Sequence, residues 1–591
     1  MLPAPAPQAL EWIRTMKNAE IARIFSEIAD MLDFLGDSPF KVRAYRAAAR
    51  YLMDMEEPIE RVAEGGEKAL DELPYIGHEL ALKILEYLET GKVRKHEELK
   101  KQVPAGVLEV MRVPGIGPRT ARRLYDELGV DSLAKLRQVL ESGEVLKLSG
   151  FGEKKRRRLL HNLELVEAAG RRRPLGEVLW LARELVARLE HLPQVEHAAL
   201  AGSARRYKET VGDLDLLAAS RRGWAVADAF VRFPEVDEVM LAGASRATVF
   251  LKTGLQVDLK IVEPEAWGAG LQYFTGSKEH SIKLRTLALD QGLKLNEYGV
   301  WRGAERVAGE SEEGVYAALG LPWISPPLRE DRGEIEAAQA GKLPELVRLE
   351  QIKGDLQVHS TWSDGKATLE ELAAAAAARG YEYLAITDHS PAVRVAGGVP
   401  PEKVAERIAA IQVVNEKNGG RPYLLAGAEV DILPDGSLDY PDEILAQLEI
   451  VLVSVHAHFN LGRQEQTRRI LRALENPYVH VLAHPTARHL GKRGPIEADW
   501  QKIFERAREL GKAVEIDGYY ARLDLPDVLA RRAGEMGLTI SLSTDAHALD
   551  HLRYMELAVG TAQRGWLGPE QVLNTRSKKE LLAWLQDVRS Q

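Results

Sequence analysis

Residues 355–389 read DLQVHSTWSDGKATLEELAAAAAARGYEYLAITDH and indicate the fold class of the C-terminal part of the chain. A short apolar run ends at His359, a helical segment follows, and the second apolar run, YLAIT, ends at Asp388-His389. Alternating strands and helices form a parallel sheet or barrel, and functional groups collect at the carboxyl ends of its strands. The unit therefore predicts an α/β domain with polar side chains along one edge.

The same pattern continues towards the C-terminus. The apolar runs YLLAGA, IVLVSV, VHVLA and TISLST lead into further His, Asp and Glu residues. With the first two runs they supply eight candidate metal ligands: His359, Asp364, His389, Glu429, His456, His484, Asp545 and His547. Imidazole and carboxylate ligands together suit a centre of several divalent ions. The segment therefore predicts a metal-dependent hydrolase.

Length and composition set outer limits. The 591 residues suffice for several domains, and 28% charged with 45% hydrophobic residues is a globular composition. The net charge of −9 excludes a uniformly basic surface but allows local patches such as 154–158 (KKRRR) and 171–173. The absence of cysteine excludes disulfides and thiol nucleophiles. We expect a cytoplasmic, nucleoid-associated protein, since no spanning apolar run or signal-peptide pattern occurs.

Three short segments in the first 160 residues share one pattern: LPYIGHE from Leu73, VPGIGPR from Val113 and LSGFGEK from Leu148. Each places a glycine turn directly before a helix, whose unpaired N–H groups and dipole suit a phosphate. The segments resemble helix-hairpin-helix motifs, which bind the DNA backbone without reading sequence. The expected DNA contacts are Gly77, Gly115, Gly117, Arg119, Gly150, Gly152, Lys154 and Lys155.

Three carboxylates in the middle of the chain form a second candidate metal site. Asp213 and Asp215 of VGDLDLL share one face of a strand, and Asp258 lies on the polar face of LQVDLKIV. Carboxylates on adjacent strands can hold the two Mg²⁺ ions that phosphoryl transfer needs. Gly202-Ser203 and the Arg205-Arg206 pair just upstream supply donors for a triphosphate.

From about Met16 to Glu330 the chain resembles the family X DNA polymerases of the polymerase beta type. GSARRYKETVGDLD (202–215) is similar to the palm motif, and QYFTGSKEHSIKLR (272–285) is similar to the thumb motif. The resemblance implies that Asp213, Asp215 and Asp258 are catalytic and bind Mg²⁺ or Mn²⁺, and that Arg285 contacts the template. It also implies nucleotide contacts by Gly202, Ser203, Arg206, Tyr273, Phe274, Gly276, Ser277 and Lys278.

The resemblance to the polymerases has departures. Lys278 and Ser281 stand where animal relatives carry an acidic residue and an asparagine, so nucleotide affinity and fidelity are not carried over. Tyr273 and Phe274 have the alternative reading of core aromatics. Lys83 aligns with the Schiff-base lysine of the polymerase beta lyase domain, but Glu79, one turn away, opposes a lowered lysine pKa. Lys83 is therefore either a lyase nucleophile or, as we favour, a phosphate contact.

The segments VHSTWSDG, AITDHS, GAEVDI, VSVHAH, LAHP and STDAH resemble, in this order, the PHP (polymerase and histidinol phosphatase) family. The resemblance implies a distorted (β/α)₇ barrel in which the eight candidate residues hold up to three Mn²⁺ or Zn²⁺ ions. Gln357 stands where the family usually has the first histidine of a His-x-His pair. We therefore expect reduced occupancy of one ion rather than an inactive centre.

The predicted fold is multidomain, combining α+β and α/β parts. The expected divisions are an N-terminal extension (1–15), a lyase-like helical domain with one helix-hairpin-helix (16–100), fingers with two such motifs (101–173), a nucleotidyltransferase palm (174–263), a thumb (264–330), a helical linker (331–353) and the PHP domain (354–591).

We expect a monomeric DNA polymerase that uses dNTPs to fill short gaps in DNA repair. Its expected substrates are gapped or primer–template duplexes, and we expect no association with a membrane. Its PHP domain would be a 3′→5′ exonuclease and an abasic-site endonuclease. One alternative is a template-independent nucleotidyltransferase with a PHP phosphoesterase acting on small monoesters. Another is a DNA-binding protein without catalysis.

Overall fold

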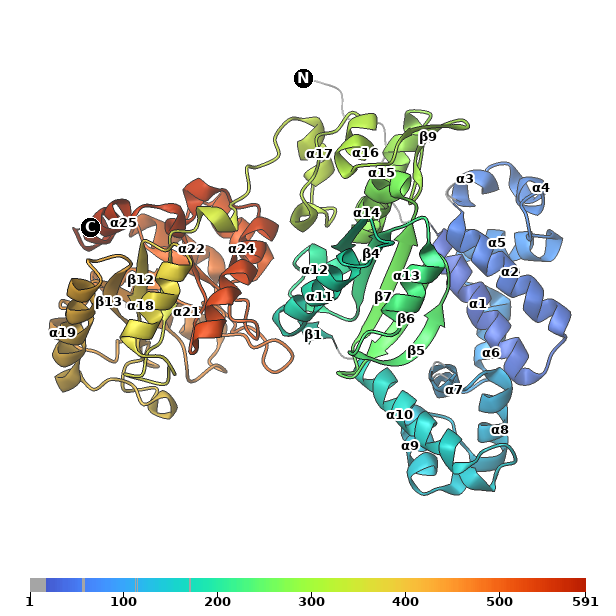
Figure 1. Cartoon of the computed structure of the whole chain (residues 1–591), viewed down its shortest axis with the longest axis horizontal. Helices are drawn as coiled ribbons and strands as arrows, with labels where there is room; N and C mark the ends of the chain where they lie inside the picture. Colours follow the sequence, from blue (N-terminus) through green and yellow to red (C-terminus); the bar gives the residue numbers. More distant parts are fainter. Residues whose placement is uncertain (1–16, 56–58, 112, 114, 170–171, 591) are drawn as a thin grey trace. The chain divides into compact units, whose positions relative to one another are not determined.

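The computed structural model describes residues 17–55, 59–111, 113, 115–169 and 172–590 (Figure 1). The expected extension 1–15 and Arg171 lie outside these residues. The chain forms two compact units. The first comprises Met1–Arg172, Arg188–Ala199 and Gly212–Leu321, and the second comprises Arg173–Ala187, Leu200–Val211 and Pro322–Gln591. Among the described helices, none has the length and apolar character needed to cross a membrane.

The first unit begins with helices packed around one hydrophobic core. Phe25 and Ile28 of α1 are fully buried there with Leu52 and Ile84. Helix α1 ends where Gly36 adopts φ 76°, a left-handed conformation that closes the last turn. The helices are α1 (Asn18–Leu35), α2 (Pro39–Asp54), α3 (Ile59–Ala63), α4 (Gly66–Asp71), α5 (His78–Thr90), α6 (Arg94–Lys100), α7 (Ala105–Val110), α8 (Pro118–Leu128), α9 (Leu133–Glu141), η2 (Glu144–Lys147) and α10 (Glu153–Ala169).

A five-stranded sheet follows, with strand order β2-β4-β7-β6-β5. Strands β4 and β7 pair in parallel, whereas β6 pairs antiparallel with both β7 and β5. The strands are β2 (His197–Leu200), β4 (Leu214–Ala219), β5 (Val236–Ala242), β6 (Arg246–Leu251) and β7 (Gln256–Val262). The elements that precede or alternate with these strands in the sequence are β1 (Arg173–Pro174), α11 (Leu175–Glu190), α12 (Gly202–Arg205), β3 (Thr210–Val211) and α13 (Gly223–Phe230).

The thumb-like segment combines helices with a small antiparallel sheet of order β10-β9-β8. Its elements are η3 (Pro264–Ala266), α14 (Trp267–Thr275), α15 (Lys278–Asp290), β8 (Lys294–Asn296), β9 (Gly299–Arg302), β10 (Glu305–Ala308), α16 (Glu312–Ala318) and η4 (Pro326–Leu328). The expected helical linker at 331–353 is mostly irregular. It contains α17 (Glu334–Gln339) and η5 (Leu349–Gln351), because Gly341 and Pro344 interrupt any longer helix.

The C-terminal part of the second unit is a nearly closed barrel of seven parallel strands in sequence order. A parallel bridge between Val358 and Ala546 joins the first strand to the last, as expected for the predicted (β/α)₇ fold. The strands are β11 (Gly354–Val358), β12 (Tyr383–Ile386), β13 (Tyr423–Asp431), β14 (Ile450–Ser454), β15 (Val481–Leu482), β16 (Ala513–Asp517) and β17 (Ile540–Ser543).

Helices connect the barrel strands and cover them. The capping box of Thr368 and Glu371 starts α18 at the position that the sequence signals. The elements are α18 (Leu369–Ala378), η6 (Arg394–Ala396), α19 (Pro401–Lys417), α20 (Asp442–Leu445), α21 (Arg463–Leu474), α22 (Trp500–Glu509), α23 (Asp527–Glu535), η7 (Leu549–Tyr554), α24 (Met555–Arg564), η8 (Pro569–Gln571), η9 (Leu573–Thr575) and α25 (Lys578–Ser590).

Candidate metal centres

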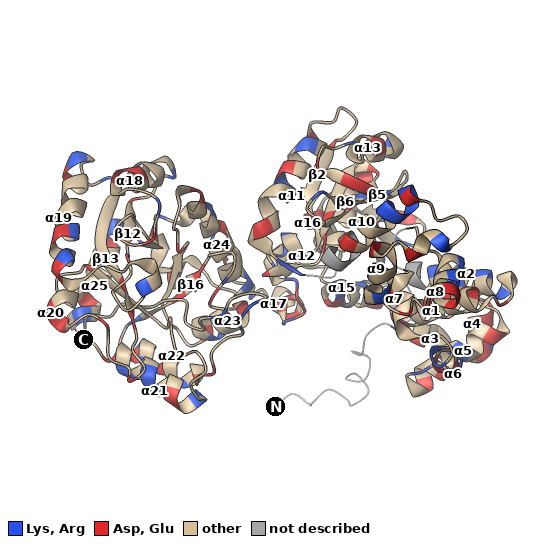
Figure 2. Ribbon diagram, turned by 90° about the horizontal axis from the view of Figure 1, so that it is seen from below, with Lys and Arg blue, Asp and Glu red and all other residues tan. Residues whose placement is uncertain are grey.

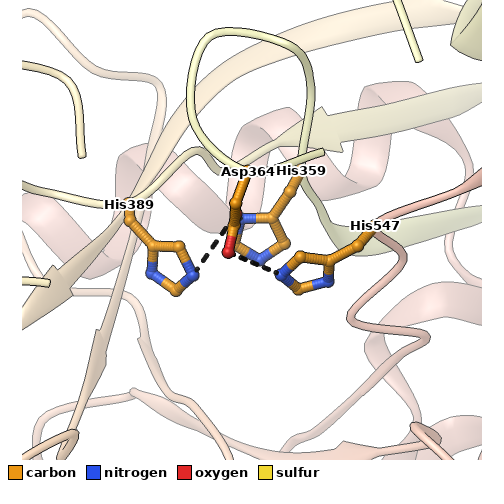
Figure 3. Close-up of side chains that lie close together, drawn as sticks. All are labelled: His359, Asp364, His389 and His547. Atoms are coloured by element: carbon orange, nitrogen blue, oxygen red, sulfur yellow. Dashed lines mark ion pairs between the residues drawn. The ribbon is translucent and has the colours of Figure 1, made fainter. Parts of the chain in front are cut away.

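The eight predicted barrel ligands lie at one end of the barrel. Each stands within or just after the carboxyl end of a strand: His359 and Asp364 after β11, His389 after β12, Glu429 in β13, His456 after β14, His484 after β15, and Asp545 and His547 after β17. In Figure 3, His359, His389 and His547 surround Asp364. Nitrogen atoms of His547 and His389 lie 3.4 and 3.8 Å from its carboxylate oxygens.

Glu429 occupies the centre of the cluster. Its carboxylate oxygens lie 2.6 Å from His484 Nε2, 3.1 Å from His389 Nδ1 and 3.2 Å from His456 Nε2. Three groups of side chains have ligand atoms close enough to share one ion: His359, Asp364, His389 and His547; His389, Glu429 and His456; and His359, Glu429 and Asp545. Residues shared between groups, such as His359 and Glu429, suit a centre in which ions lie close together.

The polar atoms of the cluster fit a bound cation. Both ring nitrogens of His359, Nε2 of His456 and Oε2 of Glu429 are buried without a hydrogen-bond partner among the described residues. A buried polar atom normally has a partner, and a metal ion supplies one to nitrogen and carboxylate oxygen alike. Gln357 Oε1 is also buried and unpaired, while its Nε2 lies 3.5 Å from Asp545 Oδ1. Its amide oxygen is thus available as a weak ligand.

Charge coupling inside the cluster is strong. Burial opposes ionisation of Glu429, but the imidazoles of His389, His456 and His484 outweigh it and hold the carboxyl pKa well below its usual range. Burial likewise disfavours charged His456, yet Glu429 and Asp431 raise the pKa of its imidazole to about 9. The cluster therefore carries the ionised carboxylates that a divalent ion requires.

Several barrel residues that the sequence analysis did not assign orient the ligands. Asp431 Oδ1 lies 3.3 Å from His456 Nδ1 and fixes the ring, a frequent arrangement at metal sites. Asp388, in the quoted TDH motif, instead accepts hydrogen bonds from Ser360 and Arg407. Glu515 and Asp517 of β16 are fully buried, and burial raises the pKa of both carboxyls. Asp517 ends β16, and this strand-end position was the sequence signal that could have found it.

The three palm carboxylates also come together. Asp215 on β4 and Asp258 on β7 are directly paired in register, and Asp213 precedes β4. Thr248 Oγ1 and Gln256 Nε2 donate hydrogen bonds to Asp258, which fixes its orientation. Burial and the charge of Asp258 raise the pKa of the Asp213 carboxyl. Mutual repulsion of this kind is relieved by a divalent cation.

Five of the residues predicted to contact the nucleotide lie around the junction between α14 and α15. Tyr273 and Phe274 lie in the last turn of α14 as a T-shaped pair with ring centroids 5.1 Å apart, and Phe274 also packs against the small hydrophobic cluster that includes Leu217 and Val262. Gly276 and Ser277 join α14 to α15, and Lys278 is exposed at the start of α15. The packing of Phe274 agrees with the core interpretation, and the contact of this half-buried pair with a nucleotide stays a prediction.

The GS segment is held inside the second unit. Gly202 and Ser203 begin α12, and Arg206 Nε donates a hydrogen bond to Glu330 Oε1 at 3.0 Å. Glu330 also accepts a hydrogen bond from Arg564 of α24 at 2.9 Å. Burial opposes the charge of Glu330, but the two guanidinium groups lower its carboxyl pKa to about 2. Arg206, a predicted triphosphate contact, is thus committed to a carboxylate in this structure.

The three glycine turns have the expected geometry. Gly77 and Gly117 are the N-cap residues of α5 and α8, and Gly152 directly precedes α10. Gly115 and Gly150 adopt φ 87° and 82°, conformations that favour glycine, and exposed Tyr75 takes the equivalent place in the first turn at φ 64°. Arg119 lies in the first turn of α8, and Lys154 and Lys155 lie in the first turn of α10. Figure 2 shows the ribbon with all described Lys and Arg residues in blue. Arg285 lies on α15.

Lys83 is engaged locally. Its Nζ lies 3.0 Å from Glu79 Oε2 and 2.9 Å from the Glu79 carbonyl oxygen. This hydrogen bond lowers the pKa of the Glu79 carboxyl. The ion pair matches the expectation that Glu79 opposes a nucleophilic role for Lys83.

A palm with paired carboxylates and a barrel with a His-rich centre together define a class of two-site enzymes that act on phosphate esters. Family comparisons agree with this class. Residues 16–93 match a helix-hairpin-helix domain, 107–164 a SAM-like helix-hairpin-helix tandem, 270–330 the DNA polymerase beta thumb and 355–523 the PHP domain.

Curated relatives match over two different lengths. The DNA polymerase/3′-5′ exonuclease PolX of Bacillus subtilis is 37% identical over 578 residues, 96% of this chain and 99% of that protein. Probable phosphatases of Thermoanaerobacter sp. and Syntrophotalea carbinolica are 31% and 27% identical to this chain. Each match covers 37% of this chain, and it covers 89% of the first phosphatase and 90% of the second. The chain therefore belongs to the family X DNA polymerases that carry a C-terminal PHP domain.

Proposed function

We propose that this chain is a DNA-directed DNA polymerase that extends a primer at the palm carboxylates and removes 3′-terminal nucleotides at the barrel centre. One observation carries the proposal: similarity over 96% of the chain to a protein whose name states both activities. In finer detail, we propose that the enzyme fills short gaps in DNA repair with dNTPs, acts as a monomer, and cleaves abasic sites. The helix-hairpin-helix and thumb matches support DNA as the partner.

Asp213, Asp215 and Asp258 would hold two ions, Mg²⁺ or Mn²⁺, in the palm. These ions would supply charge neutralisation for phosphoryl transfer. The chain's own contribution is geometric. Pairing of β4 with β7 sets Asp215 beside Asp258, while Thr248 and Gln256 fix the Asp258 carboxylate. Asp258 would accept a hydrogen bond from the primer 3′-hydroxyl and so align it for attack.

The eight barrel residues would hold up to three ions, and their nitrogen-rich character favours Mn²⁺ or Zn²⁺. Bound there, the ions would polarise the phosphodiester and activate water. The protein residues position the ligands: Asp431 orients His456, and the Glu515 carboxylate accepts the backbone N–H of His484 at 2.6 Å. Five of the eight residues are buried: His359, His389, Glu429, His484 and Asp545.

A second candidate activity, hydrolysis of small phosphate monoesters, is favoured by the barrel's similarity to probable phosphatases. One experiment separates the two. The protein is incubated with Mn²⁺ and a 5′-labelled primer in a gapped duplex, with and without dNTPs, and in parallel with p-nitrophenyl phosphate. Template-directed extension with dNTPs and stepwise shortening without them support the proposal. Monoester hydrolysis without primer shortening would replace the exonuclease with a phosphatase.

A further inference from the structure

The turn after strand β16 stands at the same barrel end as the metal cluster but carries none of the predicted ligands. The other six barrel strands lead into the eight candidate ligands, whereas β16 leads into Tyr519 and Arg522. In parallel barrels the carboxyl ends of all strands build one shared site. This turn is therefore placed to contact whatever the cluster acts on.

The turn is held rigidly. Asp517 and Asp524 form an antiparallel bridge across its base, and Arg522 N–H donates to the Tyr519 carbonyl at 2.8 Å. Tyr519 N–H donates to Asp517 Oδ1 at 2.6 Å. A Cβ on Gly518 would lie 2.5 Å from the Tyr554 carbonyl oxygen, so the backbone is tightly packed. The backbone of this turn thus holds its side chains at fixed positions relative to the candidate ligands.

Arg522 directs a cation at the cluster while keeping its donors available. Its Nε lies 3.8 Å from Asp545 Oδ2 and 3.8 Å from Asp517 Oδ2, and its side chain is 21% exposed. The guanidinium donates no hydrogen bond to any residue that the structure describes. A guanidinium has five N–H donors in a planar fork that matches two phosphate oxygens. A guanidinium whose N–H donors are unused and which lies beside a candidate metal centre is suited to bind a phosphate.

Tyr519 supplies an aromatic surface next to the same ligands. Its half-buried ring lies 5.9 Å from the ring of His551, centroid to centroid. His551 Nδ1 accepts the backbone N–H of His547, a predicted ligand, at 3.3 Å. Aromatic side chains beside a phosphate site bind single-stranded nucleic acid by stacking on bases, whatever the sequence.

We propose that Arg522 and Tyr519 form the subsite for the terminal nucleotide of a DNA 3′ end. Arg522 binds the phosphate beside the scissile bond, and Tyr519 stacks on the terminal base. The inference rests on the proposed exonuclease and names what its centre recognises. The competing explanation is that Arg522 only neutralises Asp517 and Asp545, in which case it would preserve the metal cluster and contribute nothing to substrate affinity.

The test uses the full-length, metal-loaded protein and the variants Arg522→Lys, Tyr519→Leu and Tyr519→Phe. Arg522→Lys keeps the charge and removes the fork. The matched control is Arg532→Gln, an exposed arginine on α23 that bonds Gln501. Three quantities are measured: metal content, calorimetric affinity for thymidine 5′-monophosphate, and kcat and KM for a single-stranded oligonucleotide and for bis(p-nitrophenyl) phosphate, a diester without a base.

We expect Arg522→Lys to raise the oligonucleotide KM and the nucleotide Kd about tenfold or more at unchanged metal content. Tyr519→Leu should lower the preference for oligonucleotide over the base-free diester about tenfold, and Tyr519→Phe should restore it. Unchanged KM and nucleotide affinity in both variants, or metal loss with unchanged nucleotide affinity, would overturn the proposal. If the wild type hydrolyses neither diester, the exonuclease proposal fails, and calorimetry still decides whether this subsite binds a nucleotide.

Discussion

The palm and the barrel each gather acidic side chains at strand positions, yet they do so in opposite environments. Asp213, Asp215 and Asp258 are half-buried at the sheet surface and offer only carboxylate oxygens to a metal ion. In the barrel, His359, Glu429 and His484 are at most 1% exposed, and nitrogen donors outnumber carboxylates. An open oxygen site suits Mg²⁺, which keeps waters and accepts substrate phosphates. A more buried, nitrogen-rich site selects ions that imidazole binds well.

The largest expected effect is a crossed loss of activity. Glu429→Gln should lower hydrolysis of a labelled oligonucleotide on the order of a thousandfold, because metal assistance contributes several kcal/mol to such reactions. Asp258→Asn should lower primer extension by a similar factor for the same reason. Each variant should retain the other activity within about twofold, since the two carboxylates serve different centres. Initial rates on gapped duplex, with and without dNTPs, measure both.

Circular dichroism of each variant controls for folding. If Glu429→Gln lowered extension as strongly as hydrolysis while folding normally, the separation between palm and barrel would be wrong. Both activities would then have to depend on the same centre.

The ligand contrast between the two sites also predicts different metal responses. After complete chelation, Mg²⁺ should restore primer extension but leave hydrolysis at least about tenfold below the level that Mn²⁺ restores, because imidazole suits Mn²⁺ better than Mg²⁺. Rates are measured across titrations of each metal. Equal recovery of both activities with Mg²⁺ alone would show that the palm and barrel sites do not differ in metal preference.

The strand-end positions of the candidate ligands could be predicted because strand periodicity and strand order are local or nearest-neighbour properties. Pairing of Asp215 with Asp258 and convergence of the eight barrel residues followed from parallel topology. Contacts that depend on loop shape could not be predicted. Arg522 lies five residues after β16, and its approach to Asp545 is set by the Asp517–Asp524 bridge. The pairing of Arg206 with Glu330 spans 124 residues and follows no periodicity.

Not every barrel histidine belongs to the metal cluster, and His480 provides the contrast. It is fully buried, its Nδ1 accepts the Val451 N–H, and its Nε2 lies 3.3 Å from the Leu585 carbonyl oxygen. Burial and the charges of Arg589 and Lys512 lower its pKa to about 3. As the pH falls below about 6.5, the unfolded chain takes up a proton that the folded chain refuses, so stability decreases down to about pH 3.

Between pH 6.5 and 5 this linkage amounts to about 2 kcal/mol. Melting temperatures from pH 7 to 5 should therefore fall more steeply for the wild type than for His480→Gln, which does not titrate. Parallel pH profiles of the two proteins would show that His480 is not held neutral.

A smaller effect is expected at the glycine turns, which face solvent rather than an active site. Lys154→Ala should weaken duplex binding several-fold whatever the DNA sequence and make the log–log salt slope less negative by about one unit, as for one lost phosphate contact. Lys68→Ala, an exposed lysine on α4 outside the turns, is the control. Fluorescence anisotropy at several salt concentrations measures both. Equal salt slopes for the two variants would show that Lys154, at the third glycine turn, does not contact a DNA phosphate.

The last prediction concerns Lys83, where we expect no Schiff-base chemistry. A lysine that forms a Schiff base must be present as the free amine, which desolvation or cationic neighbours favour. Here Lys83 Nζ instead forms an ion pair with Glu79 Oε2 at 3.0 Å. Borohydride added with an incised abasic site should therefore trap no covalent adduct. Glu79→Gln sharpens the test: an adduct that forms in this variant and disappears in Glu79→Gln/Lys83→Ala would show that the carboxylate alone blocks a latent lyase. A trapped adduct in the wild type that is lost in Lys83→Ala would show instead that substrate binding breaks the ion pair.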